Sequence, residues 1–149
     1  MSSINDLFLP DQVCFPLYAS SRMITRLYQP LLDEIGLTYT QYLVMLALWE
    51  EDKLSIGELG NRLFLNTNTL TPLIKKLKEK DLVDKTRSAS DERTVFISLS
   101  KKGKALQAKA KHIPKALIES LNMSDDDVAA IRDIMWRFLR NFDVAKTTS

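Results

Sequence analysis

The spacing of apolar side chains changes twice along this 149-residue chain, and that change constrains the fold more than any other feature. Up to Lys80, apolar residues recur every three or four positions, which predicts amphipathic helices. Over 83–87 and 93–99 the side chains alternate in steps of two, the period of paired strands, around a polar tip at 88–92. Helical spacing returns after Ser100. The predicted fold is therefore mainly α with one small β-hairpin.

Local start and stop signals divide the helical stretches. Gly36 ends the first helix, and the motifs Thr38-x-x-Gln41 and Ser55-x-x-Glu58 are capping boxes that begin the next two. Three further polar residues can cap later helices: Asn66, Ser100 and Ser124. The expected helices span 17–35, 38–49, 55–64, 66–80, 100–121 with an interruption near Pro114, and 124–142.

Composition is that of an ordinary globular protein, with 45% apolar and 27% charged residues. The longest apolar run, 42–49, is far shorter than the roughly 20 residues that span a bilayer. The amino terminus lacks the basic and apolar regions of a secretory signal, and the single cysteine, Cys14, cannot form an internal disulfide. We therefore expect one unit, 1–149, without membrane contact, in the reducing cytoplasm.

Charge is distributed unevenly, although the net charge is only +2. Residues 1–65 carry 4 basic and 8 acidic side chains, whereas residues 66–104 carry 10 basic and 5 acidic ones. A polyanion should therefore contact the middle third of the chain.

Residues 55–80 have the chemistry of a helix-turn-helix, because two short helices are joined by a few residues. The second helix carries side chains that can contact base edges near its start and phosphates further along: Asn68, Thr69, Thr71, Lys75 and Lys76. Its opposite face is an apolar stripe of Leu70, Leu73, Ile74 and Leu77. Taken alone, the helix is equally consistent with an amphipathic surface helix whose lysines are only solvated.

The hairpin favours the DNA-binding interpretation, because a helix-turn-helix followed directly by a two-stranded ribbon is a winged helix. A basic residue at the ribbon tip can enter the adjacent minor groove, and Arg93 lies there. Asp91 can orient this arginine and so lower the cost of ordering it on binding. The alternative is a surface ion pair worth less than about 1 kcal/mol.

The segments Thr69-Leu-Thr-Pro-Leu-Ile-Lys-Lys-Leu-Lys and Asp91-Glu-Arg-Thr-Val-Phe-Ile-Ser-Leu-Ser-Lys-Lys-Gly resemble the recognition helix and wing of MarR-type transcriptional repressors. The resemblance covers nearly the whole chain. It implies a winged helix-turn-helix lobe at about 38–100 and dimerisation helices at about 11–37 and 101–143. It further implies a homodimer on operator DNA, with Asn68, Thr69 and Thr71 at bases, Lys75 and Lys76 at phosphates, Arg93 in the minor groove, and Asp91 orienting Arg93.

The segment around Cys14, together with Tyr28 and Thr38-Tyr39-Thr-Gln-Tyr42, is similar to the organic-hydroperoxide-sensing, OhrR-like branch of this family. The resemblance implies that Cys14 is the peroxide-reactive thiol, that Tyr28 and Tyr39 hydrogen-bond it, and that Phe15 and Tyr18 line the sensor pocket. A second, resolving cysteine is not matched, because the chain has only one. An organic hydroperoxide and a low-molecular-weight thiol are then the expected reactants.

The residues themselves are consistent with a reactive thiol. Asp11 can cap a helix and Pro16 suits its first turn, so Cys14 should lie at the positive end of that helix, which favours the thiolate. Cys14 and Tyr28 are 14 positions apart, about 21 Å along one helix, so a contact between them requires a second subunit. The alternative is an inert core cysteine.

The predicted function is a redox-sensing repressor that leaves its operator when Cys14 is oxidised and then thiolated. A second hypothesis keeps the repressor but makes a small aromatic ligand the effector, with Cys14 uninvolved. We do not expect an enzyme, because a thiol peroxidase would depend wholly on external thiols to resolve the sulfenic acid. No cofactor or metal is expected, and the only histidine, His112, suits a solvated helix.

Overall fold

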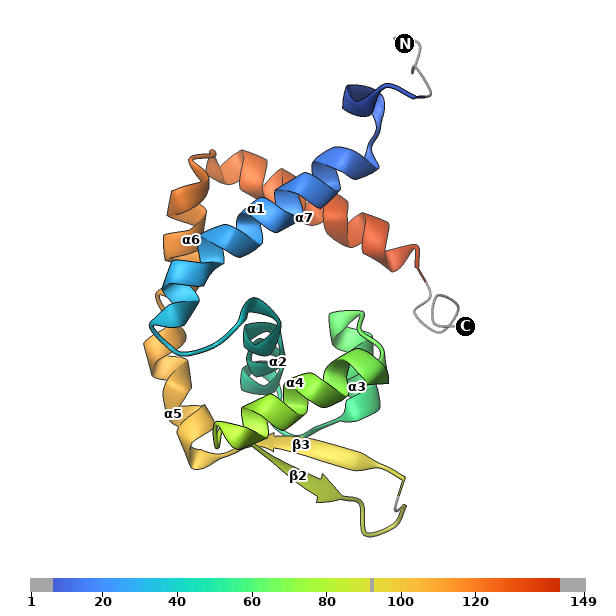
Figure 1. Cartoon of the computed structure of the whole chain (residues 1–149), viewed down its shortest axis with the longest axis vertical. Helices are drawn as coiled ribbons and strands as arrows, with labels where there is room; N and C mark the ends of the chain where they lie inside the picture. The colour runs from blue at the N-terminus through green and yellow to red at the C-terminus, as the bar shows by residue number, and fades with distance from the viewer. Residues whose placement is uncertain (1–6, 92, 143–149) are drawn as a thin grey trace.

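The computed structural model describes residues 7–91 and 93–142. Its elements follow the predicted order of helices, hairpin and helices, and Figure 1 shows their arrangement. The helices are η1 (Leu9–Asp11), α1 (Cys14–Asp33), α2 (Tyr39–Glu50), α3 (Ile56–Leu63), α4 (Thr67–Glu79), α5 (Lys101–Ala110), α6 (Ile113–Leu121) and α7 (Asp125–Arg140). The strands are β1 (Leu54–Ser55), β2 (Val83–Arg87) and β3 (Val95–Leu99).

Five of the six predicted helix caps are confirmed. In each case the side-chain oxygen of the capping residue accepts a hydrogen bond from the backbone N–H three residues later, which satisfies a donor that the first helical turn leaves without a partner. The capping residues are Thr38, Ser55, Asn66, Ser100 and Ser124. The predicted interruption near Pro114 is also confirmed, since α5 ends at Ala110 and α6 begins at Ile113.

The first long helix begins earlier than its apolar spacing predicts, at Cys14 instead of Leu17. Pro16 is its third residue, where a missing N–H costs no helical hydrogen bond. The expectation that Asp11 caps this helix is wrong: the N-cap position is Val13, which offers no side-chain cap, and Asp11 ends the preceding 3₁₀ turn.

The turn after α1 forms where Gly36 was predicted to end the helix. Gly36 adopts a left-handed φ of +69°, which L side chains rarely adopt. The backbone then reverses so that the N–H of Leu37 donates to the carbonyl of Leu32 at 3.2 Å. This turn directs the chain into α2.

The predicted hairpin is present, with Val83 opposite Leu99 and Arg87 opposite Val95 in antiparallel register. β3 begins at Val95, two residues later than predicted, and the N–H of Thr94 just before it donates to the nearby carbonyl of Asp91 at 3.0 Å. A short third strand, β1, was not predicted. It pairs with the other edge of β3, giving the sheet order β1-β3-β2.

The core lies where α2, α4 and the sheet meet. α2 is buried on several sides and packs against α1, α3, α4, α5 and β3. The opposing side chains come from the apolar stripe of α4, from the strands, and from single residues of α1, α3 and α6. The largest fully buried residues are Tyr42, Leu32, Met45, Leu48, Leu54, Leu59, Leu70, Ile74, Leu77, Ile97, Ile113 and Val44.

The amino and carboxyl helices are packed much less completely. None of the residues of α7, all of which the structure describes, is buried, and α1 buries only Leu32. In Figure 1 these two helices lie at the end of the molecule opposite the wing formed by β2 and β3. Large apolar side chains exposed there are Leu7, Phe8, Leu9, Val13, Phe15, Leu17, Tyr18, Met23, Leu27, Ile131, Ile134, Trp136, Phe138 and Phe142.

No helix in the described part of the chain is long and apolar enough to cross a membrane.

Gly103→Ala should lower the free energy of unfolding by about 1–3 kcal/mol, measured by urea denaturation. A Cβ at this position would lie 2.1 Å from the carbonyl oxygen of Leu82, which is backbone and cannot move aside. Gly57→Ala is the matched control, because its Cβ would meet only the Ser55 hydroxyl oxygen at 3.8 Å. The control should raise stability by up to about 1 kcal/mol, and equal effects of the two variants would contradict this packing.

Candidate nucleic-acid interface and thiol site

The predicted recognition helix α4 is amphipathic, and the face that was predicted to be apolar is the buried one. Leu70, Ile74 and Leu77 are fully buried, and Leu73 packs at the edge of the core. This stripe fixes α4 against α2, α3 and β2. The opposite face is therefore held toward solvent by the core itself.

The five α4 residues predicted to contact DNA are all exposed: Asn68, Thr69, Thr71, Lys75 and Lys76. The hydroxyl of Thr71 donates to the Thr67 carbonyl at 2.8 Å, so its oxygen remains able to accept a hydrogen bond. The backbone N–H of Thr69 donates to the capping side chain of Asn66 at 2.9 Å, while the Thr69 side chain is exposed. Their base and phosphate contacts stay predictions.

The wing tip is organised by Asp91. One carboxylate oxygen accepts the backbone N–H of Arg93 at 3.0 Å, and the other accepts the Thr94 hydroxyl at 3.3 Å. Asp91 was expected to bond the guanidinium; its contacts in the structure instead hold the backbone of the turn from which Arg93 extends. An exposed Arg93 on a preformed turn remains suited to a minor groove.

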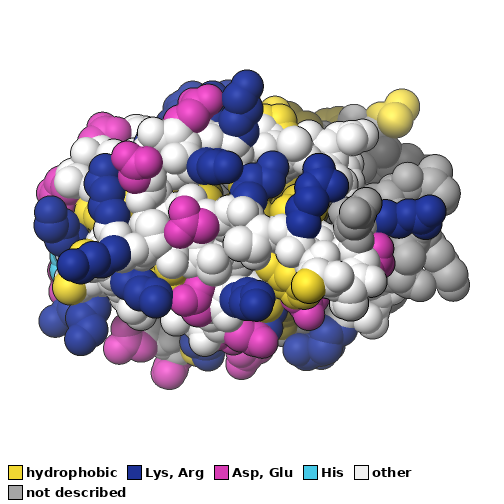
Figure 2. All heavy atoms as spheres, turned by 90° about the horizontal axis from the view of Figure 1, so that it is seen from below, with side chains coloured by type: hydrophobic (Ala, Val, Ile, Leu, Met, Phe, Trp, Pro, Cys, Tyr) yellow, Lys and Arg dark blue, Asp and Glu magenta, His cyan; other side chains and the backbone are white. Residues whose placement is uncertain are grey.

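The face that carries the wing has mixed charge. Figure 2 shows this face with Lys and Arg side chains spread across its breadth and Asp and Glu side chains between them. Attraction to a polyanion here depends on where individual cations stand, because the face is not uniformly basic.

Cys14 is the first residue of α1 and is exposed. Its neighbours Phe15 and Tyr18 are exposed as well, and the guanidinium of Arg22 lies 5.5 Å from the centre of the Tyr18 ring. The predicted lining residues of the sensor pocket therefore stand on the same unpacked end of α1 as the thiol.

The two predicted thiol-binding tyrosines contact each other. The ring centres of Tyr28 and Tyr39 are 4.9 Å apart, and Tyr42 lies 5.7 Å from Tyr28. Burial, and then the neighbouring Tyr39 and Tyr42, raise the pKa of Tyr28 to about 12, and burial raises the pKa of Tyr39. Both phenols therefore keep their protons at neutral pH and remain hydrogen-bond donors.

The structure does not bring Cys14 and these tyrosines together within one subunit. Cys14 and Tyr28 lie on the same helix, 14 residues or about 21 Å apart. Tyr42, for which no role was predicted, completes the ring cluster and is fully buried. Its spacing of three from Tyr39, which places both on one side of α2, is the signal that could have revealed it.

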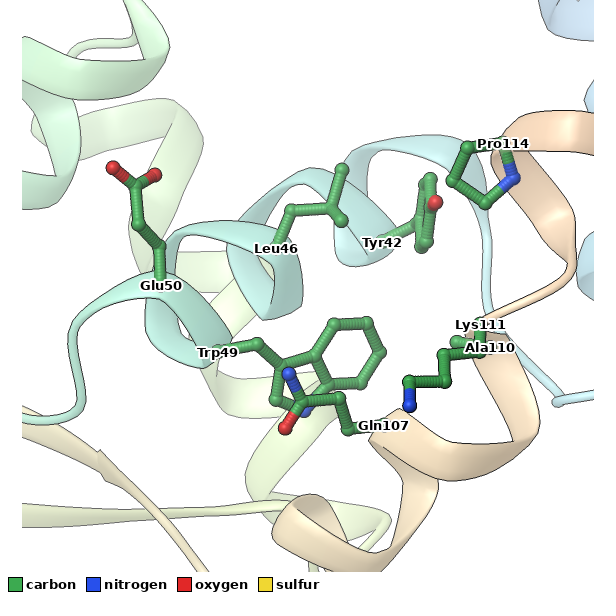
Figure 3. A pocket seen from close by; sticks show the side chains of 8 residues that line it. All are labelled: Tyr42, Leu46, Trp49, Glu50, Gln107, Ala110, Lys111 and Pro114. Carbon is green, nitrogen blue, oxygen red and sulfur yellow. The ribbon is translucent and has the colours of Figure 1, made fainter. Parts of the chain in front are cut away.

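A cavity of about 550 Å³ opens between α2 and the α5–α6 junction. Figure 3 shows Tyr42, Leu46 and Trp49 of α2 facing Gln107, Ala110, Lys111 and Pro114, with Glu50 at one side. Aromatic walls with a few polar groups are typical of small-molecule sites. Cys14 is not among its lining residues.

Comparison with known proteins gives consistent matches in sequence. A family model described as transcriptional regulator SarA/Rot matches residues 26–110. The organic hydroperoxide resistance transcriptional regulator of Bacillus subtilis (strain 168) is 40% identical over 131 residues, which cover 88% of this chain and 89% of that protein. The HTH-type transcriptional regulator SarZ of Staphylococcus aureus (strain USA300) is 40% identical over 141 residues, 94% and 95% of the two chains.

Solved structures agree with these matches. The structure of reduced AbfR bound to DNA has 33% sequence identity to this chain and a TM-score of 0.73, covering 89% of this chain and 92% of that one. AbfR is a protein of Staphylococcus epidermidis. The disulfide-formed AbfR has 32% identity and a TM-score of 0.63, covering 89% and 90%.

Substitutions on α4 should separate phosphate contacts from base contacts on a duplex selected by the wild-type protein from a random-sequence library. Lys75→Ala should weaken binding to all sequences and reduce the slope of log Kd against log salt by about 1. Asn68→Ala should cost about 1–3 kcal/mol on the selected duplex and relax its base preference. Fluorescence anisotropy measures both.

Lys109→Ala, an exposed change on α5, is the control and should alter neither property. If Asn68→Ala weakened every duplex equally, its predicted base contact would be wrong.

Proposed function

Because this chain belongs to the MarR-type transcriptional regulators, in the branch that includes SarZ and the organic hydroperoxide resistance regulator, we propose that it is a redox-sensing repressor. In this proposal a homodimer binds operator DNA and is released when an organic hydroperoxide oxidises Cys14 and a small thiol caps the product. The observation that carries the proposal is the position of the only cysteine, exposed at the first residue of α1.

The amino end of α1 provides a suitable setting for thiol chemistry. Its first N–H groups receive no side-chain cap, so they and the helix dipole can stabilise negative charge on the sulfur. The thiolate is the nucleophile in such reactions. Cys14 is exposed in the single subunit, so its own chain does not block the approach of a hydroperoxide to the sulfur.

The proposed chemistry takes place in two steps. The Cys14 thiolate attacks the terminal hydroperoxide oxygen, so that an S–O bond forms, the O–O bond breaks and the alkoxide leaves as an alcohol after protonation. Sulfur is oxidised by two electrons and the peroxide is reduced. A low-molecular-weight thiol then displaces the hydroxyl as water and forms a mixed disulfide, because the chain has no second cysteine.

The exposed apolar residues of α1 and α7 support a dimer in which these helices are covered. So many exposed large apolar side chains on two helices are unusual on a monomer and typical of an interface. A partner packed against this surface would be able to present Tyr28 of its α1 and Tyr39 of its α2 to Cys14, whereas the helical rise keeps Cys14 and Tyr28 of one subunit about 21 Å apart. We propose that the thiol site is shared between subunits.

A second candidate function is supported by the cavity between α2 and the α5–α6 junction. Its size and aromatic walls suit a small aromatic ligand that would act as effector in place of peroxide. The two candidates differ in their dependence on Cys14, because this residue does not line the cavity.

Cumene hydroperoxide plus a small thiol should weaken binding of the wild-type protein to its selected duplex by at least about tenfold, as expected when an altered spacing of two recognition helices spoils the fit to DNA. Anisotropy titrations before and after treatment measure the change, and intact-mass spectrometry reports the adduct on Cys14.

Cys14→Ser is the matched control and should bind the duplex as the untreated wild type does, with or without peroxide. Release of the Cys14→Ser protein by an aromatic ligand, combined with unchanged binding of oxidised wild type, would establish the second candidate instead.

Mixed dimers test whether the site is shared. Tyr28→Phe keeps the ring contacts with Tyr39 and Tyr42 but removes the hydroxyl, so it should slow oxidation of Cys14. A heterodimer of one Cys14→Ser subunit and one Tyr28→Phe subunit should contain one intact site, and its cysteine should react at the wild-type rate. The rate is measured by mass spectrometry after brief exposure to peroxide.

The Tyr28→Phe homodimer provides the slow reference in this experiment. A heterodimer whose cysteine reacts as slowly as that reference would contradict the shared site.

A further inference from the structure

The end of the recognition helix is joined to the turn between α1 and α2 by a single lysine. Lys80 is the C-cap residue of α4. Its ammonium nitrogen donates to the carbonyl oxygen of Gly36 at 2.6 Å and to Oε1 of Gln41 at 2.9 Å. These contacts connect segments that are 44 and 39 residues apart in the sequence.

The side chain of Gln41, which accepts one of these hydrogen bonds, is buried and has a second hydrogen-bond donor. Gln41 is 2% exposed, and it is the only polar or charged residue among the buried residues that the structure describes. The same Oε1 also accepts the backbone N–H of Thr38 at 3.1 Å, in the capping box that begins α2. Lys80 and the cap therefore share one buried oxygen, and moving either requires the other to adjust.

The turn that Lys80 holds also carries a sensor tyrosine. Tyr39 lies between Thr38 and Gln41 as the first residue of α2, and its ring packs on Tyr28 of α1. A displacement of Tyr39 by chemistry at a thiol would therefore shift the capping box and, with it, the acceptor of Lys80.

The backbone of Lys80 is fixed on the other side as well. Its carbonyl accepts the ammonium group of Lys102 at 3.1 Å, at the start of α5, and its N–H closes the last turn of α4. Lys80 is thus a point at which the α1–α2 turn, the recognition helix and the helix after the wing are bonded together.

We propose that Lys80 is a positioning residue that couples the turn between α1 and α2 to the recognition helix α4, through its bonds to Gly36 and Gln41. This proposal rests on the proposed redox function and adds the route by which a change at the tyrosines reaches DNA. Lys80 does not contact the thiol or the bases in this scheme. It sets the orientation of α4 according to the position of the α2 amino end.

The test compares Lys80→Met with Lys78→Met. Lys78 is an exposed lysine two residues earlier on α4, so both variants remove one positive charge from the same helix end. The readout is the ratio of Kd for the selected duplex after and before treatment with cumene hydroperoxide plus thiol. We expect Lys80→Met to reduce this ratio by about fivefold or more, and Lys78→Met to leave it within about twofold of wild type.

A merely structural role would not change that ratio. It would lower the thermal stability and weaken binding of reduced and oxidised protein alike, and this result would overturn the proposal. Oxidation of Cys14, followed by intact mass, should proceed at the wild-type rate in Lys80→Met. If Lys80→Met does not fold, Lys80→Gln, which keeps a neutral donor of shorter reach, is measured in the same way.

Gln41→Glu provides an independent check of the contact. With Lys80 present, the carboxylate gains a charged partner and the melting temperature should be maintained. Combined with Lys80→Met, it leaves a buried charge without its cation, and the loss of stability should exceed the sum of the single changes. Additive effects would overturn the contact.

Failure of the two proposals can be told apart. A wild-type protein whose duplex binding ignores oxidation would overturn the redox function, and the coupling role with it. A responsive wild type accompanied by an equally responsive Lys80→Met would overturn the role of Lys80 alone.

Discussion

The burial of α2 is the constraint on which the rest of the structure depends. This helix packs against α1, α3, α4, α5 and β3, and buries six of its twelve residues. A helix that contacts so many elements cannot move without repacking the core, because protein interiors are close-packed. The orientation of the recognition helix, whose stripe of Leu70, Ile74 and Leu77 lies in the same core, is therefore tied to α2.

The two ends of α2 contact different parts of the molecule. Its amino end has the capping box, Tyr39 and the acceptor of Lys80, whereas its carboxyl end has Trp49, whose indole N–H donates to the Gly103 carbonyl at 2.9 Å. The first contact leads toward α1 and the tyrosine cluster, and the second toward the helix after the wing. A small rotation of α2 would thus reach both the recognition helix and the wing, which is the kind of rearrangement a packed two-state element supports.

The exposed thiol and the unpacked faces of α1 and α7 have a common explanation in the proposed dimer. A single subunit keeps Cys14 about 21 Å along α1 from Tyr28, and leaves several large apolar side chains of α7, such as Ile131, Ile134 and Phe138, exposed. Association would cover those side chains and supply the missing donors to the sulfur. Sensing would then depend on the same interface that sets the spacing of the two recognition helices, and one chemical change would affect both.

Residues close together in the chain carried most of what could be predicted. Each capping motif satisfies backbone N–H groups of its own helix, and the strand at 83–87, recognised by its two-residue period, pairs with the next strand along the chain. These elements therefore follow from local hydrogen bonding and side-chain spacing. The apolar stripe of α4 likewise predicted which of its faces is buried. The family resemblance predicted roles for Cys14, Tyr28 and Tyr39, and the helical rise excluded contact between Cys14 and Tyr28 within one subunit.

Contacts between distant segments were decided only by packing. β1 has two residues, too few for a periodic signal, and exists because β3 offers it an edge. Asp11 does not cap α1, since it ends the 3₁₀ turn and the N-cap position falls two residues later, at Val13. Lys80 looks like any solvated lysine of a basic helix until the fold places Gly36 and Gln41 beside its ammonium group. Hydrogen bonds between neighbouring residues can be predicted from the local sequence. The bond between Lys80 and Gly36 joins residues 44 positions apart, so it forms only because the packed core places them side by side.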